Sequence, residues 1–240
     1  MKKCRKLVIV GAGEFAEIAY EYFSRDSEYE VCAFAVEKQY RTNDSLFDLP
    51  VVDFERVADL YPPSRYETYV AITYTQLNRV RKRLYMACKQ KGYRCASYVS
   101  SHAFVWHNVT IGENTFIFED NTIQYHAQIG NNVVIWSGNH IGHRSVIEDD
   151  AWLTSHVVVS GFCHIGRGSF IGVNATLGDN VVLGNDTVFG AGALTVKSLT
   201  EQGKVYVGIP AKPLLKTAYE QFSVSEAEDG IEDSQDSRDK

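Results

Sequence analysis

The chain has 240 residues, of which 45% are hydrophobic, and a formal net charge of −6. This length allows one or two domains with sizeable cores, and the composition excludes a wholly disordered protein. Proteins that bind nucleic acid need a basic surface, so the negative balance argues against that class. The charge is concentrated in residues 223–240, whose seven acids and two bases predict a disordered acidic tail.

The first hundred residues alternate between strand-like apolar runs and segments with helical periodicity. The predicted strands are residues 6–10, 31–36, 69–72 and 94–99, the predicted helices are 14–24 and 77–91, and a polar loop is expected up to residue 48. Strands that alternate with helices indicate βαβ units. Residues 1–100 are therefore expected to form an α/β domain with a small Rossmann-like parallel sheet.

Two features bear on the location of the protein. The first apolar run ends at Gly11, and it is too short for a signal-peptide core or a membrane span. The five cysteines are odd in number and lack CxxC spacing, so we expect reduced thiols. The sequence thus predicts a cytoplasmic protein without a membrane partner.

From residue 105 onward an apolar residue recurs at every sixth position without interruption. A small or short residue stands four positions after each of them, and twelve of the 18 glycines fall between residues 105 and 194. Such a hexad supplies a short strand and a tight turn, with the apolar side chain pointing into a narrow interior. The repeating positions are Val105, Ile111, Ile117, Ile123, Ile129, Ile135, Ile141, Ile147, Leu153, Val159, Ile165, Ile171, Leu177, Leu183 and Phe189.

This pattern resembles the hexapeptide-repeat acyltransferases, whose left-handed parallel β-helix is a triangular prism with three hexads per coil. The resemblance implies five coils, in which residues 18 positions apart are stacked neighbours. Asn121 and Asn139 are spaced in this way, so we expect a stacked asparagine ladder. Residues 203–213 match the segment that closes such prisms. The prism and its C-terminal cap are therefore expected over residues 101–222.

The segment Gly11-Ala12-Gly13-Glu14-Phe15-Ala16 fits G-x-G-x-x-A between the first strand and the first helix. Backbone N–H groups there could hold a diphosphate, and Glu37 at the end of the second strand could accept from a ribose hydroxyl. The alternative is an ordinary tight βα turn. Fewer than 100 residues are also too few for a full dinucleotide domain.

A small βαβ domain joined to a hexapeptide prism resembles the bacterial sugar acetyltransferases that modify nucleotide-linked amino sugars. This family includes the bacillosamine and perosamine N-acetyltransferases and the sialic-acid O-acetyltransferases, and the resemblance covers residues 6–213. It implies a nucleotide sugar on the N-terminal domain, acetyl-CoA on the prism, no metal, and a homotrimer with active sites between neighbouring prisms. The implied substrate contacts are Gly13, Glu14, Phe15, Val36, Glu37 and Thr73, and the implied acetyl-CoA contacts are Trp152, Val173 and Ala191.

The segment from Trp136 to Glu148 is similar to the stretch that carries the family's catalytic histidine, and His143 falls on that residue. The resemblance implies that His143, at a corner of the prism, takes a proton from the sugar amine that attacks the thioester. The chain departs from the family at three points. Phe15 and Trp152 stand where the family has histidines, and no carboxylate flanks His143.

The sequence predicts an acetyl-CoA-dependent N-acetyltransferase of nucleotide-linked amino sugars, acting in bacterial surface-glycan synthesis. The nearest alternative is a sugar O-acetyltransferase. Two other classes remain, namely a zinc enzyme of the γ-carbonic-anhydrase type and an inactive binding protein. The sequence names neither the sugar, the nucleotide nor the acyl chain.

Six of the seven histidines lie in the hexad repeat that begins at residue 105. His140 and His143 are three residues apart, whereas the zinc class places two of its ligands five apart, which disfavours zinc. We predict that His107, His126 and His164 are solvated turn residues. His140 and His156 are expected either to have a structural role or to contact substrate.

Overall fold

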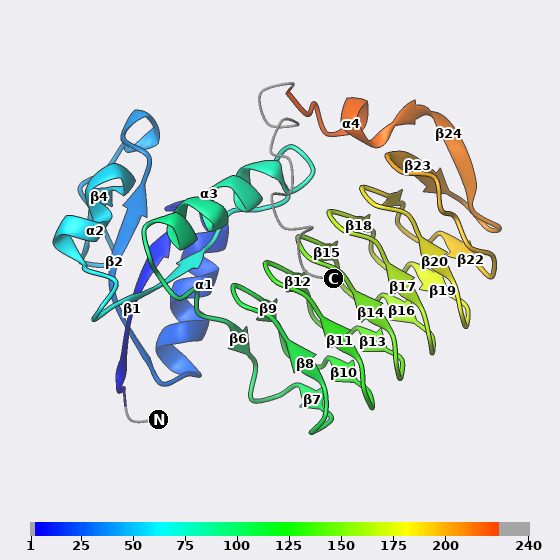
Figure 1. Cartoon of the computed structure of the whole chain (residues 1–240), viewed down its shortest axis with the longest axis horizontal. Coiled ribbons are helices and arrows are strands. Elements are labelled where there is room, and N and C mark those ends of the chain that lie inside the picture. Colours follow the sequence, from blue (N-terminus) through cyan, green and yellow to red (C-terminus); the bar gives the residue numbers. More distant parts are fainter. Residues whose placement is uncertain (1–2, 226–240) are drawn as a thin grey trace, which may run out of the picture.

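The computed structural model describes residues 3–225, and its N-terminal part is a parallel sheet with helices on both faces (Figure 1). The strand order is β3-β4-β2-β1-β5, and only β3 runs antiparallel to its neighbour. The strands are β1 (Arg5–Val10), β2 (Tyr29–Val36), β3 (Ser45–Leu46), β4 (Leu49–Asp53) and β5 (Glu67–Val70). The helices are α1 (Glu14–Arg25), η1 (Lys38–Tyr40), η2 (Phe54–Arg56), α2 (Val57–Leu60) and α3 (Arg79–Gln90).

The two faces of this sheet follow from the alternation of side chains along β1. Leu7 and Ile9 pack with α1, while Val8 and Val10 pack with α2 and α3 on the other face. The three predicted strands 6–10, 31–36 and 69–72 and both predicted helices are confirmed to within a few residues. The expected polar loop is wrong in part, because it contains η1 and the start of the β3–β4 hairpin.

The strand predicted at 94–99 is a correction, because the segment divides between the two parts of the protein. Cys95 forms a bridge with Thr68 at the edge of the N-terminal sheet. Three residues later, β6 (Tyr98–Val99) pairs with a strand of the prism. The first strand of the prism therefore precedes the expected boundary at residue 100.

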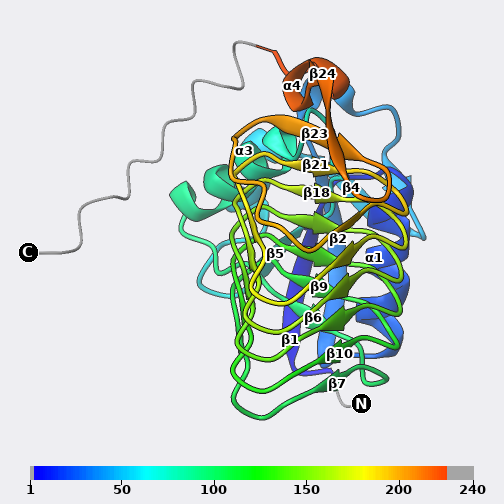
Figure 2. The same cartoon turned by 90° about the vertical axis from the view of Figure 1, so that its right-hand side faces the viewer.

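The second part is a left-handed β-helix of two-residue strands on three faces (Figures 1 and 2). Face 1 holds β6, β9 (Phe116–Ile117), β12 (Val134–Ile135), β15 (Trp152–Leu153), β18 (Phe170–Ile171) and β21 (Val188–Phe189). Face 2 holds β7 (Phe104–Val105), β10 (Thr122–Ile123), β13 (His140–Ile141), β16 (Val158–Val159), β19 (Thr176–Leu177) and β22 (Leu194–Thr195). Face 3 holds β8 (Thr110–Ile111), β11 (Gln128–Ile129), β14 (Val146–Ile147), β17 (His164–Ile165) and β20 (Val182–Leu183). We name the turns between them corners 1–2, 2–3 and 3–1.

The hexad prediction is confirmed at every position. Each of the fifteen repeating residues is the second residue of a strand from β7 to β21, and all of them pack into one core. Val105 and Ile111 are only partly buried, since they lie in the first coil at the end of the stack. The predicted asparagine ladder is also present. Asn121 Oδ1 accepts from the backbone N–H of Asn139 at 3.0 Å, and Asn139 Oδ1 accepts from Val157 at 2.6 Å.

A C-terminal cap closes the far end of the prism (Figure 2). It consists of β23 (Lys204–Val207), β24 (Lys212–Thr217) and the expected terminal helix, α4 (Ala218–Gln221). The tail was expected to leave the fold at residue 223, yet Val224 packs on the protein and Ser225 hydrogen-bonds to Gln76. The rest of the predicted acidic tail lies outside the described residues. In residues 3–225 no helix is long and apolar enough to cross a membrane.

A polar column at corner 3–1 joins the two domains. Asn114, Asn132 and Asp150 are 18 residues apart, all have a positive φ, and each amide donates to the next residue at 2.8 Å. Asn114 Oδ1 in turn accepts from the backbone N–H of Val70 at the end of β5, at 2.7 Å. This column fastens the N-terminal sheet to the prism at one corner.

Arg81 of α3 completes this attachment. Its side chain is fully buried and donates to the carbonyl oxygens of Asn132 at 2.5 Å and Asp150 at 3.2 Å, and to Asn78 Oδ1 at 3.0 Å. Burial lowers the pKa of Arg81 to about 10 and raises that of Asp150. A guanidinium ion in this position is stabilised by the oxygen atoms around it.

We predict that Asn139→Ala lowers the free energy of unfolding by about 2–4 kcal/mol, because it leaves a cavity and a buried backbone N–H without a partner. Urea denaturation followed by circular dichroism measures the change. Thr122→Ala, on the outer surface of β10, is the matched control. A loss below 1 kcal/mol for Asn139→Ala would show that the ladder adds little to stability.

Candidate functional site

A cavity of about 550 Å³ opens at the carboxyl ends of β1, β2 and β5. Gly13, Val36 and Glu37 line it, as do Thr75 and Gln76 from the loop after β5. The turn at its base requires glycine, since Gly11 has a φ of 123° and a Cβ there would lie 2.7 Å from the carbonyl oxygen of Ala71. Ligands of open α/β sheets bind at this edge, outside the carboxyl ends of the strands.

Two arginines reach the wall of this cavity. Arg83 of α3 forms a bidentate ion pair with Glu37 at 2.9 and 3.1 Å. Arg41 lies 3.3 Å from Asp53 and 3.4 Å from Asp44. Guanidinium groups on the wall of a concave site suit a phosphate-bearing ligand. The sequence reading missed both arginines, although Arg83 stands in the basic stretch of the predicted helix 77–91.

The structure brings together only some of the predicted substrate contacts. Gly13, Val36 and Glu37 line the cavity, and Glu37 reaches it paired with Arg83. Glu14 and Thr73 are exposed nearby without lining it, and Thr73 Oγ1 lies 3.1 Å from Thr75 Oγ1. Of the loop expected to contact substrate, the glycines and the backbone line the cavity, and the side chain of Glu14 does not.

Phe15 and Trp152, predicted as ligand contacts, instead form the apolar seam between the domains. Phe15 is 3% exposed and Trp152 is 1% exposed, and their ring centroids lie 5.3 Å apart. The Arg81 guanidinium carbon lies 5.2 Å from the centre of the Trp152 ring. Neither side chain is accessible to substrate or acetyl-CoA in this chain, because α1 and the loop after β5 cover this face of the prism.

His143 lies at corner 2–3 and is exposed. Its imidazole rests over Gly161 and stands edge-on to the Phe162 ring, with 5.0 Å between the ring centres. The backbone N–H of His143 donates to Gln124 Oε1 at 3.1 Å, and within residues 3–225 the imidazole itself has no hydrogen bond. Corner 2–3 is opposite face 1, which the N-terminal domain covers. One chain therefore keeps His143 and the cavity on different sides of the prism.

Val173 and Ala191 are exposed one coil apart at corner 1–2. The three predicted acetyl-CoA contacts consequently lie on different parts of the prism, because Trp152 is buried under face 1. Corner 1–2 and corner 2–3 border the same face 2. A ligand that reached both Val173 and His143 of one chain would have to cross that face.

An aromatic stripe runs along face 2 and corner 2–3 near His143. The exposed fractions of its four side chains are 54% for Phe104, 42% for Trp106, 44% for Tyr125 and 51% for Phe162. Large apolar side chains gathered on one surface mark a place where another molecule packs. This stripe surrounds the corner that carries His143.

The other histidines have structural contacts or lie in turns. His164 was predicted to be a turn residue, but it stands in β17 and its Nε2 lies 2.6 Å from Glu148 Oε1. The ring of His156 packs under Gly138. His140 is half-buried on β13. Among the described residues, no three His, Cys, Asp or Glu side chains of one chain gather in a way that could hold a metal ion.

Comparison with known proteins identifies the repeat. A family model of the bacterial transferase hexapeptide, six repeats long, matches residues 108–143 and 162–195. A comparison with curated protein sequences finds no match. These two segments of the prism thus carry the hexapeptide repeat that the model describes for bacterial transferases.

Solved structures share the whole two-domain arrangement. A His-to-Asn variant of perosamine N-acetyltransferase from Caulobacter crescentus, in complex with CoA and GDP-perosamine, superposes with a TM-score of 0.78 at 24% identity, over 88% of this chain and 97% of the other. The acetyltransferase domain of PglB from Neisseria gonorrhoeae gives 0.78 at 23% identity, over 88% and 100%. WeeI from Acinetobacter baumannii gives 0.74 at 21% identity, over 88% and 100%. This chain has the fold of the hexapeptide-repeat sugar acetyltransferases.

We predict that Gly161→Ala displaces the imidazole of His143, because a Cβ at residue 161 would lie 2.5 Å from its Cε1 atom. The ring signals of His143 in a ¹H–¹³C NMR spectrum should shift, while the thermal midpoint changes little, since the ring is exposed and can be displaced toward solvent without disturbing the core. Ser160→Ala, one residue earlier, is the control. Unchanged His143 signals in Gly161→Ala would contradict the packing described above.

Proposed function

We propose that this protein is an acetyl-CoA-dependent N-acetyltransferase that acts on a nucleotide-linked amino sugar. The observation that carries the proposal is the arginine-lined cavity of the N-terminal domain joined to a hexapeptide prism with an exposed His143. Structures with this fold have been solved in complex with CoA and GDP-perosamine and in complex with acetyl-CoA. A nucleotide sugar and a coenzyme A thioester are the two kinds of ligand that the proposal requires.

The cavity is suited to the nucleotide part of the substrate. The turn at Gly11 and the start of α1 present backbone N–H groups, and Arg41 and Arg83 supply positive charge for a diphosphate. Glu37 keeps lone pairs for a ribose hydroxyl even while Arg83 holds it, because a carboxylate has about four acceptor sites. The sugar then extends out of the cavity toward a partner chain.

The proposed active site is shared between chains of a homotrimer. His143 cannot meet the cavity of its own chain, since the prism separates them. The aromatic stripe of Phe104, Trp106, Tyr125 and Phe162 offers the contact surface for a neighbouring prism. In such an assembly the His143 corner of one chain faces the cavity of the next.

His143 is the proposed general base. As the sugar amine attacks the thioester carbonyl, a bond forms between nitrogen and the acetyl carbon, and the imidazole takes the proton that the nitrogen loses. The carbon–sulfur bond then breaks, and the imidazolium returns the proton to the leaving CoA sulfur. Gly161 and Phe162 set the plane of the ring. Val173 and Ala191 at corner 1–2 are proposed to border the acetyl-CoA of a neighbouring active site.

We predict that His143→Ala lowers kcat about 10²–10⁴-fold with acetyl-CoA and a nucleotide-linked amino sugar, because general-base catalysis contributes on this order. KM should change little. A panel of UDP-, GDP- and dTDP-linked amino sugars and their hydroxyl counterparts provides the substrates. Turnover of the hydroxyl sugars alone would contradict N-acetylation, and a kcat of His143→Ala within a few-fold of the unaltered protein would remove His143 as the base.

We predict that two inactive variants complement each other. Gly13→Trp fills the cavity, since nothing lies within 4 Å of a Cβ at residue 13, and His143→Ala removes the base. Random co-assembly of equal amounts should restore about a quarter of the sites, because each site needs one intact half from each of two chains. The doubly substituted chain mixed with itself is the control. No recovery in mixed trimers would place both halves of the site in one chain.

A further inference from the structure

The loop between β5 and α3 has an uncommon backbone conformation where it borders the nucleotide cavity. Gln76, Leu77 and Asn78 have φ values of 50°, 49° and 67°, so three consecutive residues with side chains are left-handed. Such residues occur singly as a rule, and a run of them persists only where surrounding structure enforces it. Thr75 and Gln76 of this loop line the cavity, as do Val80 and Arg83 in the helix that follows.

The support for this loop comes from the last coil of the prism and from the C-terminal segment up to Ser225. Leu77 is fully buried in a cluster with Val188, Val205 and Ala218, the first residue of α4. The backbone N–H of Ser225 and its hydroxyl both donate to Gln76 Oε1, at 3.3 and 3.1 Å. A contact 149 residues distant in sequence thus fixes a side chain that lines the cavity.

Aromatic packing holds the start of the same loop. The Tyr74 ring stands edge-on to Phe170 at 4.9 Å and to Phe222 at 5.9 Å between centres. Phe222 also packs on Phe170 at 5.3 Å. Phe222, which follows α4, therefore completes an aromatic cluster with Tyr74 and Phe170 beside the turn.

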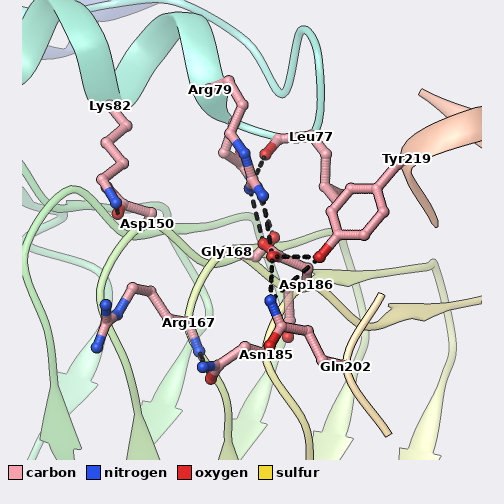
Figure 3. A network of polar contacts seen from close by, with 12 residues as sticks. Leu77, Arg79, Lys82, Asp150, Arg167, Gly168, Asn185, Asp186, Gln202 and Tyr219 are labelled. Atoms are coloured by element: carbon pink, nitrogen blue, oxygen red, sulfur yellow. Dashed lines mark hydrogen bonds and ion pairs between the residues drawn. The ribbon is translucent and has the colours of Figure 1, made fainter. Parts of the chain in front are cut away.

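A polar network ties α4 to the first turn of α3 (Figure 3). Arg79 donates to both carboxylate oxygens of Asp186, at 2.7 and 2.9 Å, and to the carbonyl oxygen of Leu77 at 3.2 Å. The Tyr219 hydroxyl of α4 donates to Asp186 Oδ2 at 3.0 Å, and Gln202 does so at 3.3 Å. Asp186 is thus the junction between the prism, the C-terminal segment and the helix that carries Arg83.

We infer that residues 218–225 are a positioning element of the nucleotide cavity, which hold the left-handed turn at Gln76–Asn78 in the shape that receives the ligand. The inference rests on the proposed function for the identity of that ligand. Within the described part of the chain, residues 218–225 form no hydrogen bond or ring contact with His143, Val173 or Ala191, so we expect acetyl-CoA binding to be independent of this segment. Loss of the contacts releases the turn, and the ordered wall of the cavity is lost with it.

The test uses the full-length chain with Phe222→Ala combined with Ser225→Ala. Gln221→Ala changes an exposed residue of the same segment and is the control. Phe222→Leu with Ser225 intact keeps an apolar side chain at this position, and we expect it to retain much of the protection of the loop. The first measurement is hydrogen–deuterium exchange of residues 73–80 in the ligand-free protein. We expect exchange at least tenfold faster in the double variant, with unchanged exchange in the hexads of faces 2 and 3.

The second measurement is the affinity for UDP and for GDP by isothermal titration calorimetry, with CoA titrated in parallel. We expect at least a fivefold weaker nucleotide affinity in the double variant and an unchanged affinity for CoA. Equal exchange of residues 73–80 in the double variant and the control overturns the inference. Faster exchange with equal nucleotide affinity also overturns it. If the unaltered protein binds neither of these nucleotides nor dTDP, the proposed function fails, and the exchange measurement still decides whether the segment holds the turn.

Discussion

A left-handed residue recurs at every sixth position from Asn114 to Gly192, one in each turn of this stretch, and the domain arrangement depends on this constraint. At corner 3–1 these positions are filled by Asn114, Asn132, Asp150 and Asp186, since asparagine and aspartate tolerate a positive φ better than other residues with side chains. A turn residue at a solvated corner needs no protein partner. Here the corner is covered, so the polar side chains need hydrogen bonds, and the N-terminal domain supplies two of them through Val70 and Arg79. Arg81 donates to the backbone carbonyl oxygens of the same corner. The requirement of the local turn thereby creates the site where the second domain is attached.

The apolar half of the same interface shows how two departures from the family depend on each other. The resemblance to sugar acetyltransferases implies histidines at positions 15 and 152, and this chain has Phe15 and Trp152. These rings are neighbours in space, and together with Phe116, Phe118 and Trp136 they make one aromatic group. Replacing one histidine alone would leave the other imidazole facing a hydrophobic ring without a hydrogen-bond partner. The two aromatic residues are chemically consistent with each other, because each ring packs on an apolar neighbour and neither needs a polar partner there.

The repeat was the most predictable part of the protein, since one hexad pattern determines strand, turn and interior at once. Fifteen inward positions, the asparagine ladder at Asn121 and Asn139, and the exposed corner position of His143 all follow from that period and are seen in the structure. The column of Asn114, Asn132 and Asp150 has the same spacing of 18 and could have been found in the same way. The cavity was harder to predict, because Arg41, Arg83 and Gln76 come from three segments that only the folded sheet brings together. Residues 94–99 were misread since a short apolar run does not reveal which of two sheets it joins.

Gly168 interrupts the corner column where the next side chain would stand, and the amide of Asn78 donates to its carbonyl oxygen at 3.3 Å. The contacts of α3 and its N-cap together span the five coils, from Lys89 at Glu113 to Arg79 at Asp186. At about 1.5 Å per residue, α3 advances about 15 Å from residue 79 to residue 89, and four coil spacings of about 4.8 Å are about 19 Å. The long side chains of Arg79 and Lys89 cover the difference. The helix therefore contacts the whole height of this corner of the prism. A coil added or removed within this stretch would preserve the hexad core and yet move the anchoring groups beyond the change past their partners on α3, so a helix of the other domain constrains the number of coils here.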